Sequence, residues 1–456
     1  MSRRTFVIII VAVALLAIAT TVKSGWLYLV SSVLFAIVPV SLLSGWRATR
    51  RLEVVRQCPA EVFEGEPFSV RLTVRNAGRF GRYLVSFRDR QFGGGAGAGI
   101  DRKLRVRRDR LVAFIRAEGT GEGGIAGAGL EVNAPRGEAT VAIDSLPAGE
   151  SVEAAYELVA PRRGIFAETE ILVSSGGVFG GASIRRRILA PSALTVFPAV
   201  SPIDHFPFDP VVSVALAESY EWGRKGAGQD YYGVREYVHG DSLRHIHWRS
   251  SARQGQLIVK EYQQEFRPTA GLLLILGRPR NGDGVKNSLE DGLRAAASIL
   301  DYYTGMGSVP RLIVPRDGGF EFVERETLHG CLEVLAGYQP PGGREESDAE
   351  EGQLLLPRGV GFAREMLGQG RSLTVVTNAP VDELARSMVG LNGAEEVSLV
   401  LVVEESYGPG WDENKAARVA EEVGRSARGR PDRFYFLTRG AEIGRCLSEP
   451  LSGTAA

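Results

Sequence analysis

The residues best suited to chemistry gather in one short stretch, Arg235 to Arg253, with the sequence REYVHGDSLRHIHWRSSAR. It holds three of the five histidines of the chain, His239, His245 and His247, close to Asp241. Imidazoles together with a carboxylate form a ligand set that suits zinc, iron or nickel. A metal-dependent hydrolase that uses Asp241 and the nearby histidines is therefore one hypothesis for this protein.

The spacing of these residues argues against catalysis. His245 and His247 are two apart and would share a face only in a strand, whereas the sequence around them is typical of a helical turn. Ser250 and Ser251 lie beside the histidines, but neither sits in a nucleophile elbow. We therefore expect no catalytic residue, no bound metal and no cofactor, and favour a protein that is not an enzyme.

A structural role for the stretch follows from its turn residues. Gly240 and Asp241 form a turn pair, and Asp241 would cap a following helical turn while facing Arg244 three residues later. The buried side of that turn would comprise Leu243, Ile246 and Trp248. These residues would act as a lock of the fold.

Charge parity supports the structural role. Residues 230–265 contain five basic and five acidic side chains, a balance that favours internal ion pairs over an open phosphate site. We favour the lock, and keep a docking surface for a partner, or a phosphate or catalytic site, as alternatives.

The elements that must position this stretch belong to a large chain. At 456 residues it exceeds what one hydrophobic core supports, so two or three domains are expected. The 54 basic and 54 acidic residues cancel, which argues against a nucleic-acid binder. Cys58, Cys331 and Cys446 lack metal-ligand or disulfide-framework spacing, so we expect buried apolar fillers in a reducing compartment.

Residues 1–51 predict a two-helix transmembrane anchor. Residues 6–22 and 26–46 are uncharged runs near the length that crosses a bilayer, joined by a short polar connector. A signal peptide would explain the first run but not the second. Arginines flank the two outer ends, whereas the connector carries only Lys23, so the soluble bulk is expected in the cytoplasm, at the inner membrane.

The soluble part divides into three predicted regions. Residues 52–200 contain alternating, β-branched runs such as FSVRLTVRN, typical of a β-sandwich-like domain. Residues 201–267 hold the chemically rich stretch. In residues 268–456 short apolar runs alternate with helical periodicity, which predicts a doubly wound, parallel α/β domain. The fold class is therefore a multidomain α+β chain behind a helical hairpin.

The central stretch resembles a known signature. The bacterial family named after domain of unknown function 58 carries the pattern R-E-Y-x-x-G-D-x-x-R-x-I-x-W-x-x-x-A-R, followed by a strand that ends in Lys-Glu. The matching residues here are Arg235, Glu236, Tyr237, Gly240, Asp241, Arg244, Ile246, Trp248, Ala252, Arg253, Lys260 and Glu261. The three histidines fall at positions that the pattern leaves variable, so the resemblance gives them no role.

The resemblance implies an architecture and partners. Members often combine a two-helix anchor, a β-rich segment, the signature and a C-terminal von Willebrand factor type A-like domain. They are commonly encoded beside MoxR-type AAA+ ATPases and transglutaminase-like membrane proteins. The resemblance therefore implies a membrane-anchored cytoplasmic docking or assembly protein. A metal-dependent hydrolase and a structural envelope protein are the alternatives.

The type A-like domain is expected to be a degenerate, metal-free version. Functional domains of this kind bind magnesium through D-x-S-x-S after the first strand, with a Thr and an Asp from later loops. Here that strand ends in Leu-Gly-Arg-Pro, residues 276–279, so Arg278 would place a cation where the metal sits. Thr377 and Asn378 stand where a Thr-Asp pair would be. Asp283 is the nearby carboxylate, but its spacing is wrong.

Overall fold

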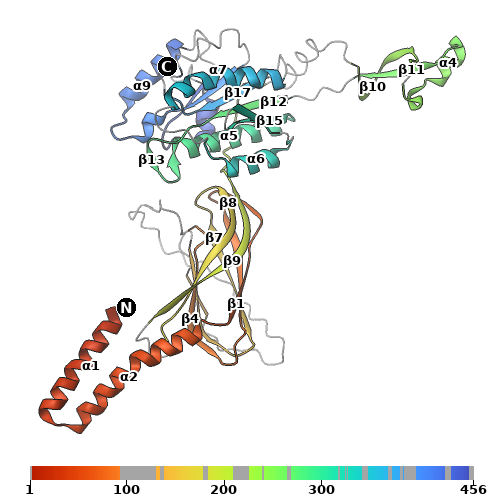
Figure 1. Ribbon diagram of the computed structural model, residues 1–456. Helices are drawn as coiled ribbons and strands as arrows, with labels where there is room; N and C mark the ends of the chain where they lie inside the picture. Colours follow the sequence, from red (N-terminus) through yellow and green to blue (C-terminus); the bar gives the residue numbers. More distant parts are fainter. Residues whose placement is uncertain are drawn as a thin grey trace. The chain divides into compact units, whose positions relative to one another are not determined.

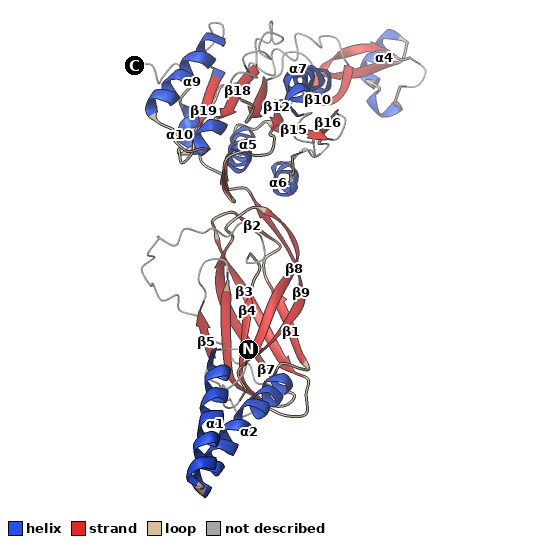
Figure 2. Cartoon of the chain, turned by 60° about the vertical axis from the view of Figure 1, so that its left-hand side comes forward, coloured by secondary structure: helices blue, strands red, loops and turns tan. Residues whose placement is uncertain are grey.

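The computed structural model divides into two compact units, Met1–Ala199 and Val200–Ala456. It describes residues 3–92, 130–133, 138–177, 183–208, 225–238, 241–263, 269–316, 319–323, 325, 327–340, 348–367, 372–380, 384, 397–426 and 433–450. Figure 1 gives the element labels, and Figure 2 separates helices from strands. Each unit has its own sheets, and each is described by itself.

The first unit begins with two apolar helices, α1 (Arg3–Val22) and α2 (Gly25–Ala48). They form a helical hairpin, and both are long and apolar enough to cross a membrane (Figure 1). The hydroxyl of Ser31 donates to the carbonyl of Ala12 at 3.0 Å, which ties the helices together. Most of their apolar side chains are exposed, unlike those of a soluble core helix. The predicted pair of N-terminal helices is thus present.

The rest of this unit consists of two sheets. The smaller has the order β1-β3-β7 and the larger the order β2-β9-β8-β4-β6-β5. Their bounds are β1 Leu52–Gln57, β2 Glu61–Phe63, β3 Pro67–Asn76, β4 Arg82–Asp89, β5 Leu130–Asn133, β6 Ala139–Leu146, β7 Ser151–Val159, β8 Gly164–Ser175 and β9 Ile184–Phe197. The pairs are antiparallel except β2 with β9, which is parallel.

The two sheets contribute to one hydrophobic core. In β3 the side chains of Phe68, Val70, Leu72 and Val74 are buried, as their alternation predicts. They join Phe87 of β4 and core residues of β6 and β8 in a single cluster. Alternate burial on both sheets therefore explains why the strands form where they do.

A buried polar network connects the two sheets inside this core. The guanidinium of Arg56, on β1, donates to the carboxylate of Asp89, on β4, at 2.8 Å, and the two side chains are 0% and 1% exposed. The hydroxyl of Tyr156, on β7, donates to the same carboxylate at 2.7 Å. Arg56 also donates to the hydroxyl of Ser192, on β9, at 2.5 Å.

The pKa values of this network reflect its burial. Burial raises the pKa of Tyr156, and the negative charge of Asp89 raises it further, so Tyr156 stays a neutral donor. Burial alone lowers the pKa of Arg56, but the attraction of Asp89 outweighs this effect and the pKa is raised. Arg56 and Asp89 are therefore a charged pair held between two sheets.

The second unit contains a six-stranded sheet with the order β16-β15-β12-β17-β18-β19. Its strands are β12 Thr269–Ile275, β15 Val309–Arg316, β16 Gly319–Phe322, β17 Ser372–Thr377, β18 Val397–Val402 and β19 Phe434–Leu437. All neighbours are parallel except β16, which pairs antiparallel at one edge. The prediction of a largely parallel α/β sheet is thus correct in outline, with one antiparallel edge strand that the sequence analysis did not predict.

Helices cover both faces of this sheet (Figure 2). Their bounds are α5 Ser288–Gly305, α6 Leu328–Gly337, α7 Asp348–Leu367, α9 Glu413–Ser426 and α10 Ile443–Ser448. Residues of α7 and α9 pack with the strands in one cluster, while α5 contacts α6 and α10 on the other face. Coverage of both faces explains why β12 is a continuous apolar run.

Several local expectations needed correction. Ser288 is the N-cap that the helical spacing of SLEDGLRAAASIL indicates, but the N-cap of α5 is Asn287, whose carboxamide oxygen accepts the amide of Glu290 at 2.9 Å. Residues 340–352, PPGGREESDAEEG, have the charged, Pro- and Gly-rich composition of a linker, but helix α7 already starts within them, at Asp348. The helical spacing of VDELARSMVGL predicts a helix over residues 381–391, but only Leu384 of this range is among the described residues. Most of the Gly-rich stretch 91–139, where the sequence indicates long loops, also lies outside the described residues.

The cysteines are free thiols in different surroundings. Cys331 is buried, and burial raises its pKa to about 11, so the thiol is neutral and inert near pH 7. Cys58 and Cys446 are only half-buried. The expectation of buried apolar fillers is therefore correct for Cys331, whereas Cys58 and Cys446 are more exposed than expected.

Candidate functional site

The chemically rich stretch forms the connection of a β-hairpin in the second unit. Strands β10 (Lys225–Glu236) and β11 (Ile258–Gln263) pair antiparallel, with Glu236 opposite Ile258 (Figure 1). Between them lie a short 3-10 helix, η1 (Leu243–His245), and the helix α4 (Trp248–Gln254). The signature residues are thus carried by one hairpin and its connection.

An ion pair fixes the start of this connection. The guanidinium of Arg235 donates to both carboxylate oxygens of Asp241, at 2.6 and 2.7 Å. The backbone amide of Val238 donates to Asp241 Oδ2 at 2.9 Å, and the Asp241 amide donates to the Val238 carbonyl at 3.0 Å. A two-bond arginine–carboxylate pair is a strong, directional contact, so Asp241 closes a turn on the end of β10.

This geometry corrects the predicted partner of Asp241. The sequence analysis paired Asp241 with Arg244 and gave it the role of a helix cap. In the structure Asp241 bonds backward, to Arg235 and Val238, and Arg244 is exposed. The N-cap of η1 is Ser242, whose side chain makes no capping bond. The bonds of Asp241 therefore connect it to the end of the preceding strand, β10.

Helix α4 is capped by a histidine. Nδ1 of His247 accepts the backbone amide of Ser250 at 3.2 Å and lies 2.6 Å from the Ser250 hydroxyl. The helix ends at Gly255, whose φ of 74° lies in the left-handed region that favours glycine. The contact between His247 and Ser250 is thus part of a helix cap.

Ser251 ties α4 to the hairpin. Its buried hydroxyl donates to the carbonyl of His247 at 3.1 Å and accepts the amide of Ile258 at 2.9 Å. The amide of His247 in turn donates to the Ile258 carbonyl at 2.8 Å. The connection therefore lies against β11 through a continuous set of hydrogen bonds.

The apolar core of the hairpin is small, and this corrects a second expectation. Ile246, Ile258 and Val259 are buried, and Ile246 forms an isolated bridge with Val259. Leu243 and Trp248 were expected on the same buried side, but they are 64% and 67% exposed. Only Ile246 of the three predicted residues is in the core.

The outward face of α4 combines an aromatic ring with cations. Trp248, Arg249, Ala252 and Arg253 are exposed and follow helical spacing, opposite the buried Ser251. Leu243 and Arg244, which lie on η1 shortly before α4 in the sequence, are also exposed. From Ser242 to Leu257 there are three arginines and no acidic residue. This segment therefore presents apolar and positively charged groups together.

The remaining signature residues lie along the two strands. Glu236 accepts from the Gln256 carboxamide at 2.7 Å, and the Tyr237 amide donates to the Leu257 carbonyl at 2.9 Å. Lys260 is half-buried on β11, opposite Val234. Glu261 is placed on β11 by its backbone, opposite Gly233. Gly240 lies outside the described residues, together with His239.

A metal site is not assembled in the described part of the chain. There, no three His, Cys, Asp or Glu side chains come together as ligands. The carboxylate of Asp241 is already bonded to Arg235, while His247 caps α4.

A second polar cluster lies where the parallel strands of the sheet end. Asn378, directly after β17, accepts the amide of Gly277 at 2.8 Å and donates to its carbonyl at 3.2 Å. Glu404, two residues after the end of β18, accepts the amides of Arg280 and Asn281, each at 2.8 Å. Function in α/β sheets concentrates at this edge.

Glu404 is a residue that the sequence analysis missed. Its second oxygen accepts from the hydroxyl of Ser288, which also accepts from the Asn378 carboxamide. Arg278 was expected to place a cation at this position, but its side chain is exposed. The carboxylate that accepts the loop amides here is that of Glu404. The signal was a carboxylate directly after the buried run VSLVLVV.

We expect Asp241→Ala to open the turn after β10. The change removes both bonds from Arg235 and the acceptor of the Val238 amide, a loss of about 1–3 kcal/mol locally. Limited trypsin digestion at Arg244 and Arg249 should then become roughly ten- to hundredfold faster, since cleavage follows the open population.

Two variants control for this effect. Asp241→Asn keeps one acceptor and should give an intermediate rate, and Asp301→Ala removes an exposed carboxylate on α5 and should leave the rate unchanged. An unaltered digestion pattern in Asp241→Ala would mean that the pair does not hold the turn.

The fold and this hairpin define a class of protein. It is a two-unit, mixed α/β chain with an apolar helical pair at its N-terminus and a hairpin closed by an arginine–carboxylate pair. Residues 233–286 match the family model described as "Protein of unknown function DUF58", so this segment of the chain is similar to that family. The matched range includes Arg235, Asp241 and the outward face of α4.

Other comparisons add little. No curated protein matches the chain. Among solved structures, AvmM, which catalyses macrocyclization in alchivemycin A biosynthesis, is 16% identical with a TM-score of 0.17, over 31% of this chain and 87% of that chain. Spo0M from Bacillus subtilis is 10% identical with a TM-score of 0.15, over 41% and 58%. A GH20 exo-β-N-acetylglucosaminidase from Vibrio harveyi is 9% identical with a TM-score of 0.20, over 82% and 80%. Similarities this low carry no argument about fold or function.

Proposed function

We propose that this protein is a membrane-anchored docking or assembly protein and not an enzyme. The observation that carries the proposal is the outward face of α4, where Trp248 lies beside Arg249 and Arg253. Tryptophan and arginine are the residues most enriched at the energetic centres of protein interfaces. A large exposed ring on a helix that is bonded to β11 suits recognition better than catalysis.

The membrane anchor is the pair α1 and α2. Both have the length and apolarity that spanning requires. Arg47, Arg50 and Arg51 follow the second helix, while Lys23 is the basic residue between the two. By the positive-inside rule the chain that follows α2 faces the cytoplasm.

The second unit is proposed to be a degenerate von Willebrand factor type A-like domain. Its parallel sheet with one antiparallel edge strand supports this assignment. At the edge where such domains hold magnesium, Glu404 is bonded to loop amides and to Ser288 instead. The two sheets of the first unit, which share one core, support a β-sandwich-like domain.

The proposed partner of the α4 face is a MoxR-type AAA+ ATPase. The family resemblance supplies this candidate, together with a transglutaminase-like membrane protein. A cationic and aromatic face would suit a partner surface in which carboxylates surround an apolar depression. Residues 242–257 bring the cations and the ring to such a surface.

A pull-down from solubilised membranes tests the proposal. The full chain, kept with ATP, should recover the ATPase, and Trp248→Ala should lower the recovery at least tenfold, because loss of a central interface tryptophan costs about 2 kcal/mol or more. Leu189→Ala is a matched control, since Leu189 is exposed to a similar degree in the first unit. Equal recovery with all three proteins, or no ATPase with any, would contradict the proposal.

A further inference from the structure

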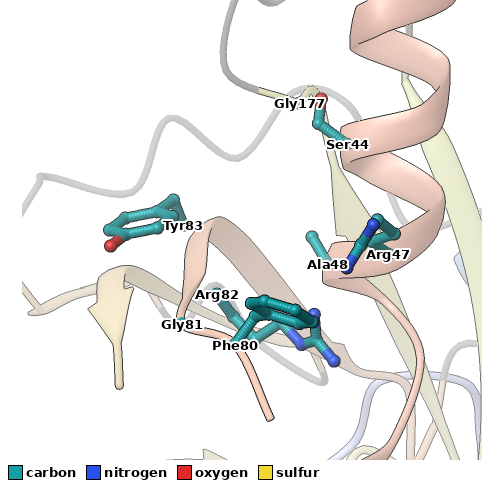
Figure 3. A pocket seen from close by; sticks show the side chains of 8 residues that line it. All are labelled: Ser44, Arg47, Ala48, Phe80, Gly81, Arg82, Tyr83 and Gly177. Carbon is teal, nitrogen blue, oxygen red and sulfur yellow. The ribbon is translucent and has the colours of Figure 1, made fainter. Parts of the chain in front are cut away.

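A pocket of about 220 Å³ lies in the first unit, at the last turn of α2. Figure 3 shows its walls: Ser44 and Arg47 from the helix, Phe80, Arg82 and Tyr83 from the start of β4 and the residues before it, and Gly177 after β8. Helix and strands thus contribute to one cavity. The signature residues described above are not part of it.

The helix is held tightly against the strands beside this pocket. A Cβ at Gly177 would lie 2.4 Å from the carbonyl oxygen of Ser41, and one at Gly45 would lie 3.2 Å from the carbonyl oxygen of Ser175. The guanidinium of Arg186 donates to the carbonyl of Thr49 at 3.3 Å. Glycine at these two positions therefore lets the end of α2 pack directly against the strand β8 and the residues that follow it.

The pocket contains a buried cation. Arg82 is only 6% exposed, and its buried Nε has no hydrogen-bond partner among the residues that the structure describes. Burial lowers the pKa of Arg82, and the positive charges of Arg47 and Arg51 lower it further. An unsatisfied donor beside like charges is costly, so an anion placed here would be bound favourably.

The charges at this end of α2 are not balanced within the described residues. Among those, none of Arg47, Arg50, Arg51 and Arg82 forms an ion pair with a carboxylate. Guanidinium groups bind phosphate through paired N–H donors. The chemistry of the pocket therefore fits a phosphate group.

The rim of the pocket is aromatic. Phe80 and Tyr83 are exposed, and the guanidinium of Arg47 lies 4.8 Å from the ring centre of Phe80. Arg50 lies 4.0 Å from the ring centre of Trp46, which is also exposed. Aromatic and basic side chains gather at the level of lipid headgroups when a helix leaves a bilayer.

We propose that this pocket binds the phosphate of an anionic phospholipid headgroup, through Arg47 and Arg82. The inference rests on the proposed membrane anchor, because the last turn of α2 must then lie at the headgroup level. Arg82 would donate from within the cavity and Arg47 from its rim. Ser44, on the same helix face one turn earlier than Ala48, adds a hydroxyl to the wall.

Native mass spectrometry of the full chain in detergent tests this site. Titration with phosphatidylglycerol should give a bound lipid at lower concentration than titration with phosphatidylcholine, whose headgroup has no net charge. Arg47→Gln and Arg82→Gln should each weaken phosphatidylglycerol binding roughly tenfold, the effect of losing one charge-assisted contact. Arg71→Gln, an exposed arginine on β3, should leave binding unchanged.

Other results would overturn the site or change its ligand. Equal binding of both lipids, or wild-type binding in the Arg47→Gln variant, which changes an exposed residue and should fold, would overturn the proposal. If inorganic phosphate bound with the same affinity and displaced the lipid, the pocket would belong to a soluble phosphate ligand.

The anchor is tested separately. Carbonate extraction of membranes should leave the full chain in the pellet, because spanning helices resist this treatment. Release into the supernatant would contradict the anchor, and the phosphate titration of the detergent-free chain would then still report on the pocket. Failure of the anchor and failure of the site are thus distinguishable.

Discussion

Replacing Asp89 with alanine should lower the free energy of unfolding of the first unit by about 3–5 kcal/mol. The change leaves the guanidinium of Arg56 buried without its carboxylate, and removes the acceptor of the Tyr156 hydroxyl. Hydrogen exchange of peptides from β3 and β7, followed through a denaturant series, measures the effect in this unit alone.

Matched variants separate the effect of losing a buried ion pair from the effect of losing an exposed one. Glu153→Gln breaks the exposed pair with Arg71 and should cost less than about 1 kcal/mol. Tyr156→Phe removes one hydrogen bond to Asp89 and should cost about 1 kcal/mol. A loss below 1 kcal/mol in Asp89→Ala would mean that water reaches Arg56 and that the network is not a closed link.

A double variant completes this test. Arg56→Met with Asp89→Leu removes both charges and replaces them with apolar groups of similar size. Because the cost of burying the pair disappears with the pair, the double variant should be clearly more stable than Asp89→Ala alone. Additive losses would contradict a mutual ion pair.

Replacing Glu404 with alanine should free the loop that follows β12. The amides of Arg280 and Asn281 and the hydroxyl of Ser288 lose their acceptor at once. Each unsatisfied buried donor costs about 1–3 kcal/mol, so the loop should open rather than keep all three. Hydrogen exchange in peptides covering 276–287 should accelerate at least a hundredfold.

The neighbouring Glu405 provides the control. It is exposed, so Glu405→Ala removes the same charge without disturbing the loop and should leave exchange unchanged. In the unaltered chain, added magnesium or a chelator should also change nothing, because Glu404 already satisfies the loop donors. A magnesium-dependent slowing of exchange would contradict a metal-independent edge.

Periodicity made much of the fold predictable. Alternation along β3 gave its buried face correctly, and the apolar run of β12 indicated a strand covered on both sides. The uncharged runs at the N-terminus indicated two helices of spanning length. These features depend on residues near one another in the sequence, where pattern and structure are directly related.

The ion-pair partner of a side chain was less predictable, because it depends on which strand ends beside that side chain. Asp241 had two arginines within reach along the chain, and spacing favoured Arg244, whereas the end of β10 brought Arg235 to it. Trp248 was assigned to the core because it is apolar. The core of the hairpin consists of Ile246, Ile258 and Val259, and Trp248 lies outside it. The local sequence does not indicate that this core is so small.

Contacts across long separations were not predictable at all. Arg82 meets the end of α2 only because the helix packs on the strands, and no motif marks it. Glu404 was visible as a carboxylate after a buried strand, yet its bonds to the loop after β12 required the strand order β12-β17-β18. Topology, and not spacing, brings these groups together.

The short sequence range of the hairpin contacts has a consequence for the order of folding. Arg235 and Asp241 are 6 residues apart, and Glu236 and Gln256 are 20 apart, whereas the bond between Gly277 and Asn378 spans 101. Closing a short loop costs less entropy and takes less time than closing a long one. During synthesis the hairpin is therefore able to close before β17 and β18, which come later in the chain, have been made.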